Sequence, residues 1–164
     1  MTKGRKALRE RVTKYDGEGR ERKQLEVLAQ ELKVQEKVIF CGEVKEHDLP
    51  DYYRLADIFL FLPREEMDDV EGFGLVALEA SSCGVPVIAA ESGGVPDAVR
   101  SGETGVLVQP DNIPEILMVM ERILSQPDYA KELGEGGRIF AQSRPWSLFV
   151  ETIAQQVAHF TGKH

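Results

Sequence analysis

Short apolar runs alternate with segments of helical periodicity along this chain. The apolar runs predict strands over residues 38–41, 57–62, 86–90 and 105–108, the first closed by Gly42 and the second by Pro63. Apolar positions at three- and four-residue steps, with helix start and stop signals, predict the helices. They cover 21–33, 49–55, 74–82, 114–125, 129–141 and 146–160, with a helical turn over 96–100.

The predicted strands are apolar almost throughout and do not alternate with polar residues. This pattern is typical of parallel strands that are covered by helices on both faces. Together with the strand–helix order, it predicts an α/β fold with a doubly wound, Rossmann-like parallel sheet. Ligands of such sheets bind beyond the carboxyl ends of the strands, so the loops 42–47, 63–73 and 91–95 are the candidate binding loops.

The charge of the chain is uneven. The 164 residues have a formal net charge of −8, but residues 1–24 hold nine Lys/Arg against four Asp/Glu. The acidic body excludes a protein that coats nucleic acid or an anionic membrane. The basic segment could attract phosphates, although such a run is more often a solvated charged face.

The cysteines and the apolar runs indicate the compartment. Cys41 and Cys83 cannot form a disulfide scaffold, and each lies among apolar residues, so we predict buried free thiols. The strongest apolar run, 58–62, is far shorter than the roughly 20 residues that span a bilayer. We therefore expect a cytoplasmic protein, with no membrane contact indicated in this segment.

The most informative stretch is 71–80, in which Glu71 and Glu79 flank two glycines at a helix entry. Glycine permits a close approach of the backbone to a ligand, and the unpaired amides of a helix start suit a phosphate. Glu79 in the second turn could accept hydrogen bonds from a ribose diol, and Glu71 could meet a polyhydroxylated group beyond the phosphate. Alternatively, the glycines serve only the turn, and the carboxylates face water.

The surrounding motifs resemble those of glycosyltransferase family 4, the retaining enzymes of the GT-B fold, from about Gly17 to Phe160. The matching segments are Gly17-Glu18-Gly19, Val38-Ile39-Phe40-Cys41-Gly42, the E-x7-E signature from Glu71 to Glu79, Cys83-Gly84-Val85-Pro86-Val87, Gly93-Gly94-Val95-Pro96 and Thr104-Gly105. The resemblance implies the C-terminal, donor-nucleotide half of a GT-B fold with its first strands truncated. It divides the chain into an atypical basic segment, 1–16, and a nucleotide-sugar-binding domain, 17–164.

The resemblance also implies roles for single residues. Glu79 matches the glutamate that holds the ribose hydroxyls, and Glu71 matches the catalytic glutamate that contacts the donor sugar. The amides of Phe73, Gly74 and Leu75, with Gly72 beside them, would approach the sugar and diphosphate. The family holds the nucleotide base by backbone contacts near the position of Val44. Arg20 or Lys3 would take over the diphosphate contact.

The implied reaction is the transfer, with retention, of a hexose from a nucleotide-diphosphate sugar to a saccharide or lipid acceptor. Amides at a helix start and basic side chains can stabilise the charge of the departing diphosphate. We expect no metal and no cofactor, because no Cys/His or Asp/Glu cluster has the spacing of ligands. His47 could touch a base, although a solvated loop histidine is the simpler interpretation.

The N-terminal residues depart from the family pattern. The family has an apolar strand before the Gly-x-Gly turn, but here Arg9, Glu10, Arg11 and Lys14 interrupt the apolar residues. Burying these charges in a central strand would be costly, so we predict that residues 5–15 are helical or disordered. The acceptor half of the family has no counterpart in this sequence. We therefore expect a missing acceptor domain or partner chain, and no turnover by this chain alone.

Three other functions remain open from the sequence. The chain could be a stand-alone nucleotide-sugar-binding module or a subunit without catalysis of its own. A dinucleotide oxidoreductase would need a G-x-G-x-x-G turn after an apolar first strand, whereas Gly17-Glu18-Gly19 follows a charged segment. A nucleotide-sugar epimerase of the GT-B fold is the third alternative.

Overall fold

The computed structural model describes residues 13–16, 21–63 and 74–144. The chain forms two compact units, Met1–Leu55 and Ala56–His164. The predicted helix over 146–160 lies outside the described residues.

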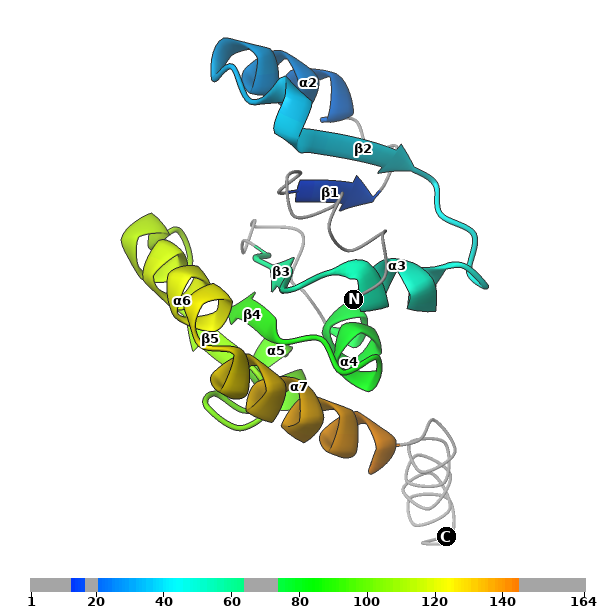
Figure 1. The fold of residues 1–164 in the computed structure, drawn as a ribbon, viewed down its shortest axis with the longest axis vertical. Helices are drawn as coiled ribbons and strands as arrows, with labels where there is room; N and C mark the ends of the chain where they lie inside the picture. Colours follow the sequence, from blue (N-terminus) through cyan, green and yellow to red (C-terminus); the bar gives the residue numbers. More distant parts are fainter. Residues whose placement is uncertain (1–12, 17–20, 64–73, 145–164) are drawn as a thin grey trace, which may run out of the picture. The chain divides into compact units, whose positions relative to one another are not determined.

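The first unit contains a pair of parallel strands (Figure 1). Strand β1 (Thr13–Asp16) pairs with β2 (Val38–Gly42), and Thr13 lies opposite Val38. Helix α2 (Arg22–Glu31) and the 3-10 turn η1 (Gln35–Lys37) lie between the two strands in sequence, and α3 (Leu49–Leu55) follows. The hydrophobic pattern predicts the helix over 21–33, the strand over 38–41 and the helix over 49–55, but not β1.

Strand β1 corrects the prediction for residues 5–15. Residues 13–15 form an ordered strand paired to β2, so the expectation of helix or disorder is wrong for them. Residues 5–12 lie outside the described residues. The desolvation argument overestimated the cost because β2 is only half-buried from Val38 to Cys41. A strand paired to such a partner need not be a fully buried central strand.

The second unit contains a three-stranded parallel sheet in the order β3–β4–β5 (Figure 1). The strands are β3 (Phe59–Phe61), β4 (Val87–Ala90) and β5 (Val106–Val108). The helices are α4 (Leu75–Ser82), α5 (Val95–Ala98), α6 (Ile113–Ser125) and α7 (Pro127–Gln142). Each agrees within a few residues with the predicted element, and the parallel α/β fold class is confirmed.

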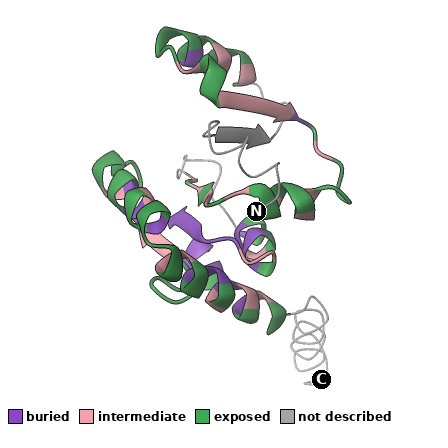
Figure 2. Cartoon of the chain, viewed as in Figure 1, coloured by how far each residue is buried: buried purple, intermediate pink, exposed green. Residues whose placement is uncertain are grey.

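The core of the second unit surrounds β4, in which every residue is buried (Figure 2). On one face, Ile88 clusters with residues from β5, α6 and α7: Val108, Ile116, Val119, Ile123 and Leu133. Helix α4 packs against β3, β4 and α7. Helices on both sides of the sheet explain why the strands lack alternation.

Two further expectations can be compared with the structure. Cys41 and Cys83 are free thiols, as predicted, but both are half-buried, so the prediction of full burial is wrong. Cys41 lies near the end of β2, and Cys83 directly follows α4. None of the helices within the described ranges is long and apolar enough to cross a membrane.

Candidate functional site

Helix α4 begins at Gly74, which has left-handed backbone angles (φ 70°, ψ 41°) and is buried. A Cβ at Gly74 would lie 3.5 Å from Cε1 of Phe61, 3.5 Å from Cβ of Ala98 and 3.7 Å from Cα of Val95. The start of α4 is therefore held between the end of β3 and helix α5. A residue other than glycine would be strained in this conformation.

The first turn of α4 presents backbone amides. The carbonyl of Gly74 accepts the amide of Ala77 at 2.9 Å, so Leu75 and Val76 precede the first helical hydrogen bond. No described side chain caps this helix. Amides at such a position carry the positive end of the helix dipole, and they can bind an anion.

Helix α4 has a buried face of small residues and an exposed face that carries the candidate carboxylate. Ala77, Ala80 and Ser81 are buried, whereas Leu75 and Glu79 are exposed. Leu75 and Glu79 lie four residues apart, so they share one side of the helix. Glu79 occupies the second turn, as predicted, one turn beyond the amides of the helix start.

The turn after β4 packs against the start of α4. The amide of Glu91 donates to the carbonyl of Val108 at 2.8 Å, and the amide of Val95 donates to the carbonyl of Ser92 at 3.1 Å. Gly93 has a positive φ of 50°. This geometry places Val95, the last residue of the predicted binding loop 91–95, against the start of α4.

A small cavity also lies at this end of the sheet, between the strand ends and α6. Its volume is about 80 Å³, and its lining includes Leu62, Pro63, Ala90, Ile113 and Ile116. Ligand pockets for drug-sized molecules measure about 300–1,000 Å³, so a nucleotide sugar would not fit inside it. The exposed face of α4 is the better candidate surface.

The structure places only some of the predicted site residues. It brings Gly74, Leu75 and Glu79 together at the start of α4. Glu71, Gly72, Phe73, Arg20 and Lys3 lie outside the described residues.

Two other expectations concern the first unit and metal ions. Val44 is half-buried in the loop after β2. His47 is exposed, with Nε2 at 3.5 Å from Oδ1 of Asp48. Across 13–16, 21–63 and 74–144, no group of three His, Cys, Asp or Glu could hold a metal ion.

Sequence reasoning missed one polar pair at the carboxyl end of the sheet. Nε2 of Gln109 donates a hydrogen bond of 2.9 Å to Oε2 of Glu91. Each residue directly follows a predicted strand, 105–108 for Gln109 and 86–90 for Glu91. Their shared position after neighbouring parallel strands was the signal that could have identified them.

Comparison with known proteins identifies a matching family and several relatives. Residues 16–140 match the family described as "Glycosyl transferases group 1". A relative from Mycolicibacterium smegmatis, a GDP-mannose-dependent alpha-(1-6)-phosphatidylinositol monomannoside mannosyltransferase, is 39% identical over 119 residues. That match covers 71% of this chain and 31% of the relative, so the chain spans about a third of the relative's length.

Two solved structures are similar in fold. HepE from Anabaena, in complex with UDP-glucose, matches with a TM-score of 0.75 and 25% identity, over 93% of this chain and 41% of HepE. The C-terminal domain of a group 1 glycosyl transferase from Francisella tularensis matches with a TM-score of 0.64 and 27% identity. That match covers 74% of this chain and 60% of the other.

Proposed function

This chain belongs to the group 1 glycosyltransferase family, as the domain that forms the C-terminal half of the GT-B fold, and we propose that it binds the donor of a retaining hexosyl transfer. In this proposal, the donor is a nucleotide-diphosphate sugar and the acceptor is a saccharide or lipid. The acceptor site would come from a further domain or a partner chain.

One observation carries the proposal. The buried, left-handed Gly74 starts a helix whose first residues, Leu75 and Val76, are exposed, and Glu79 is exposed one turn further along. A nucleoside diphosphate has an anion beside a ribose diol. The amides at the start of α4 would hold the diphosphate, and the Glu79 carboxylate would accept hydrogen bonds from the two ribose hydroxyls.

The chemical step needs charge stabilisation on the leaving diphosphate. Amides fixed at the start of α4 would supply it without reorganising during the reaction. Glu71 would contact hydroxyls of the donor sugar, with the backbone of Gly72, Phe73 and Leu75 beside it, as the family resemblance implies. Val44 is proposed near the nucleotide base by the same resemblance.

Two parts of the proposal concern charge and location. Arg20 is our candidate for the basic side chain that contacts the diphosphate. A cytoplasmic location is also proposed, because both cysteines are free thiols and disulfides are rare in that compartment.

A stand-alone binding module is the second candidate. It requires only the donor contacts proposed above, at the start of α4 and at Glu79. Both candidates predict donor binding, but only the first predicts hexosyl transfer once an acceptor domain is supplied. A transfer assay with the acceptor domain of a related enzyme, added as a separate chain, would separate them.

Isothermal titration calorimetry tests donor binding directly. The chain is titrated with UDP, GDP and ADP, then with UDP-glucose and GDP-mannose, and we expect heat from at least one pair. Glu79→Ala should weaken that affinity by about 1.5–3 kcal/mol, the contribution of a charged hydrogen bond. Glu132→Ala, at an exposed position of α7, is the matched control and should bind normally. Folded protein that releases no heat with any nucleotide would refute the proposal.

A further inference from the structure

The Glu91–Gln109 pair lies at the end of the sheet where ligands of doubly wound folds bind. Glu91 directly follows β4 and Gln109 directly follows β5. Both side chains are exposed, although Nε2 of Gln109 reaches Oε2 of Glu91 at 2.9 Å. This end of the sheet also carries the start of α4.

The side-chain bond is not needed to join the two strands. The ladder already pairs β4 with β5, and the Glu91 amide extends it with a 2.8 Å bond to Val108. Both side chains are exposed, so water competes for their hydrogen bond. The hydrogen bond between Glu91 and Gln109 is therefore not explained by the pairing of β4 with β5.

A network below the pair holds Gln109 in position. The backbone N–H of Gln109 donates to Oε2 of Glu115 at 3.0 Å, and the same oxygen accepts a hydrogen bond from Nδ2 of Asn112 at 3.0 Å. Oδ1 of Asn112 in turn accepts the amide of Glu115 at 3.3 Å, which caps α6. The backbone that carries the Gln109 side chain is therefore fixed by the start of α6, as supporting contacts fix residues of binding sites.

The turn that carries Glu91 also contacts the start of α4. Glu91 leads into the turn in which the amide of Val95 bonds the carbonyl of Ser92. The Cα of Val95 lies 3.7 Å from the position of a Cβ at Gly74. The pair and the proposed diphosphate-binding amides are thus linked by one short, packed turn.

The functional groups of Glu91 and Gln109 determine which part of the donor they can bind. A carboxylate repels a diphosphate, but its oxygens and the amide oxygen of Gln109 accept hydrogen bonds from hydroxyl groups. We propose that Glu91, oriented by Gln109, binds hydroxyls of the donor sugar and is a specificity-determining residue. The inference rests on the proposed function, and it adds a contact to the sugar alone.

Calorimetry on the full chain tests this, with two probes for each nucleotide. UDP is compared with UDP-glucose, and GDP with GDP-mannose. Glu91→Ala should weaken binding of the sugar nucleotide on the order of 10-fold and leave binding of the nucleotide diphosphate within about twofold. Glu91→Gln keeps an acceptor oxygen and should bind with intermediate affinity. Glu103→Gln, exposed in the turn before β5, is the control and should change neither affinity.

The outcomes distinguish the two proposals. If wild type binds no nucleotide diphosphate, the donor-binding proposal itself fails and the Glu91 role falls with it. If wild type binds and Glu91→Ala has unchanged affinity for the sugar nucleotide, only the Glu91 role is overturned. An equal loss for both probes also overturns it, because the residue would then be structural. Circular dichroism verifies folding, and Glu91→Gln decides the question if Glu91→Ala does not fold.

Discussion

Gly136 of helix α7 lies directly against the backbone carbonyl of Glu103, so that a Cβ at this position would overlap the oxygen. Two other glycines of the same helix make similar contacts. Gly134 faces the carbonyl of Gly84, and a Cβ at Gly137 would lie 3.0 Å from the carbonyl oxygen of Thr104. Helix α7 therefore packs directly against the backbone of two turns, one at Gly84 and one at Glu103 and Thr104. Only glycine permits so close an approach.

Gly136→Ala should destabilise the second unit. Alanine in a helix interior normally stabilises by about 1 kcal/mol relative to glycine, but here the clash with Glu103 should reverse the sign. We expect a net loss of about 1–3 kcal/mol, as for other overpacked sites. Urea unfolding measures the difference, with Glu132→Ala on the same helix as the control. A Gly136→Ala variant as stable as wild type would contradict the close contact.

The elements that could be predicted from sequence are those in which the local pattern carries the signal. The apolar run 86–90 predicts β4 because its burial on both faces removes alternation, and Gly74 predicts the start of α4 because the turn requires a left-handed residue. The contact of Gly136 with Glu103 could not be predicted, because it joins segments far apart in the chain. Strand β1 was missed because charged residues interrupt the apolar pattern of residues 5–15.

In the candidate binding site, too, only positions within one element could be predicted from sequence. Glu79 could be placed on a helix turn from its spacing to Gly74, since both lie in one element. The pairing of Glu91 with Gln109 depends on the order of β4 and β5 in the sheet, which the sequence pattern does not specify.

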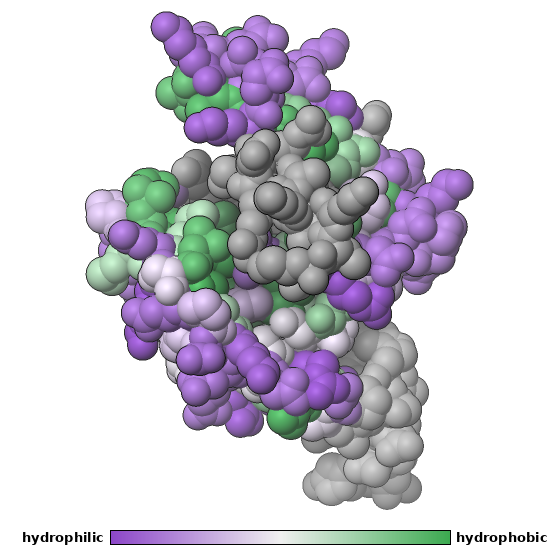
Figure 3. Space-filling model, in the orientation of Figure 1, coloured by the Kyte–Doolittle hydropathy of each residue, from purple (hydrophilic) through white to green (hydrophobic). Residues whose placement is uncertain are grey.

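Neighbouring residues of α6 should respond very differently to truncation. Ile116 is 6% exposed within the core cluster, whereas Leu117 is 58% exposed. Figure 3 shows hydrophobic surface gathered over α6, where Ile113 and Met118 are also exposed. Ile116→Ala should cost about 2–5 kcal/mol of unfolding free energy, and Leu117→Ala about 0.5 kcal/mol or less. Chemical denaturation of both variants checks this, and equal losses would contradict the assigned faces of α6.

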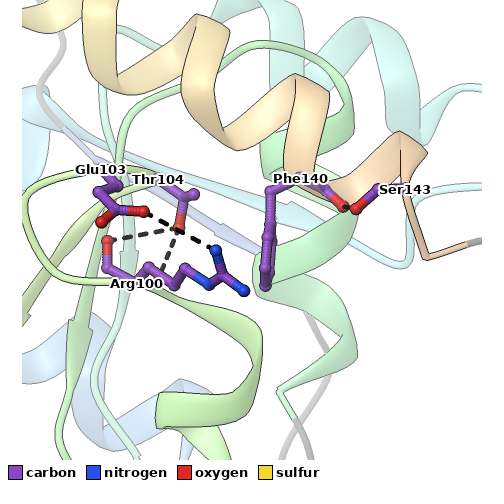
Figure 4. Close-up of polar contacts among 5 residues, drawn as sticks. All are labelled: Arg100, Glu103, Thr104, Phe140 and Ser143. Carbon is purple, nitrogen blue, oxygen red and sulfur yellow. Dashed lines mark hydrogen bonds and ion pairs between the residues drawn. The ribbon is translucent and has the colours of Figure 1, made fainter.

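The side chain of Thr104 forms a hydrogen bond within the turn before β5 (Figure 4). Its buried Oγ1 accepts the amide of Arg100 at 2.8 Å, and the Arg100 guanidinium lies 4.8 Å from the centre of the Phe140 ring. Thr104→Val keeps the shape but leaves the Arg100 amide unpaired, so we expect a loss of about 1–3 kcal/mol in urea unfolding. Ser125→Ala removes an exposed hydroxyl and should be nearly neutral. A neutral Thr104→Val variant would show that the amide finds another partner.

The Glu135–Arg138 pair on α7 should make a small, pH-dependent contribution. Nη2 of Arg138 lies 2.6 Å from Oε1 of Glu135, and this hydrogen bond lowers the pKa of Glu135. A lowered pKa stabilises the fold above the unfolded-state pKa of the carboxyl group, and the contribution is lost as the pH falls through the folded-state pKa. The stability difference between wild type and Glu135→Gln should therefore be present at neutral pH and vanish in acid. Thermal unfolding across pH measures it, and a difference that persists in acid would contradict the assignment.

Gly74→Ala should separate the strain of the α4 start from its role in binding. The nearest atoms to an added Cβ are 3.5 Å away, so the methyl group fits and the cost comes from the positive φ of 70°. We expect a loss of about 1–2 kcal/mol in stability. Relief of this strain would shift the first amides of α4, so nucleotide-diphosphate affinity should also fall.

Gly102→Ala is the matched control for this change. Gly102 has a φ of 83° and no atom within 4 Å of an added Cβ, and it lies in the turn before β5. Its substitution should cost similar stability but leave binding of UDP or GDP unchanged, because this turn precedes its strand and the binding edge lies beyond the strand ends. Denaturation and calorimetry on both variants give the comparison. Equal affinities for Gly74→Ala and Gly102→Ala would remove the α4 start from the binding site.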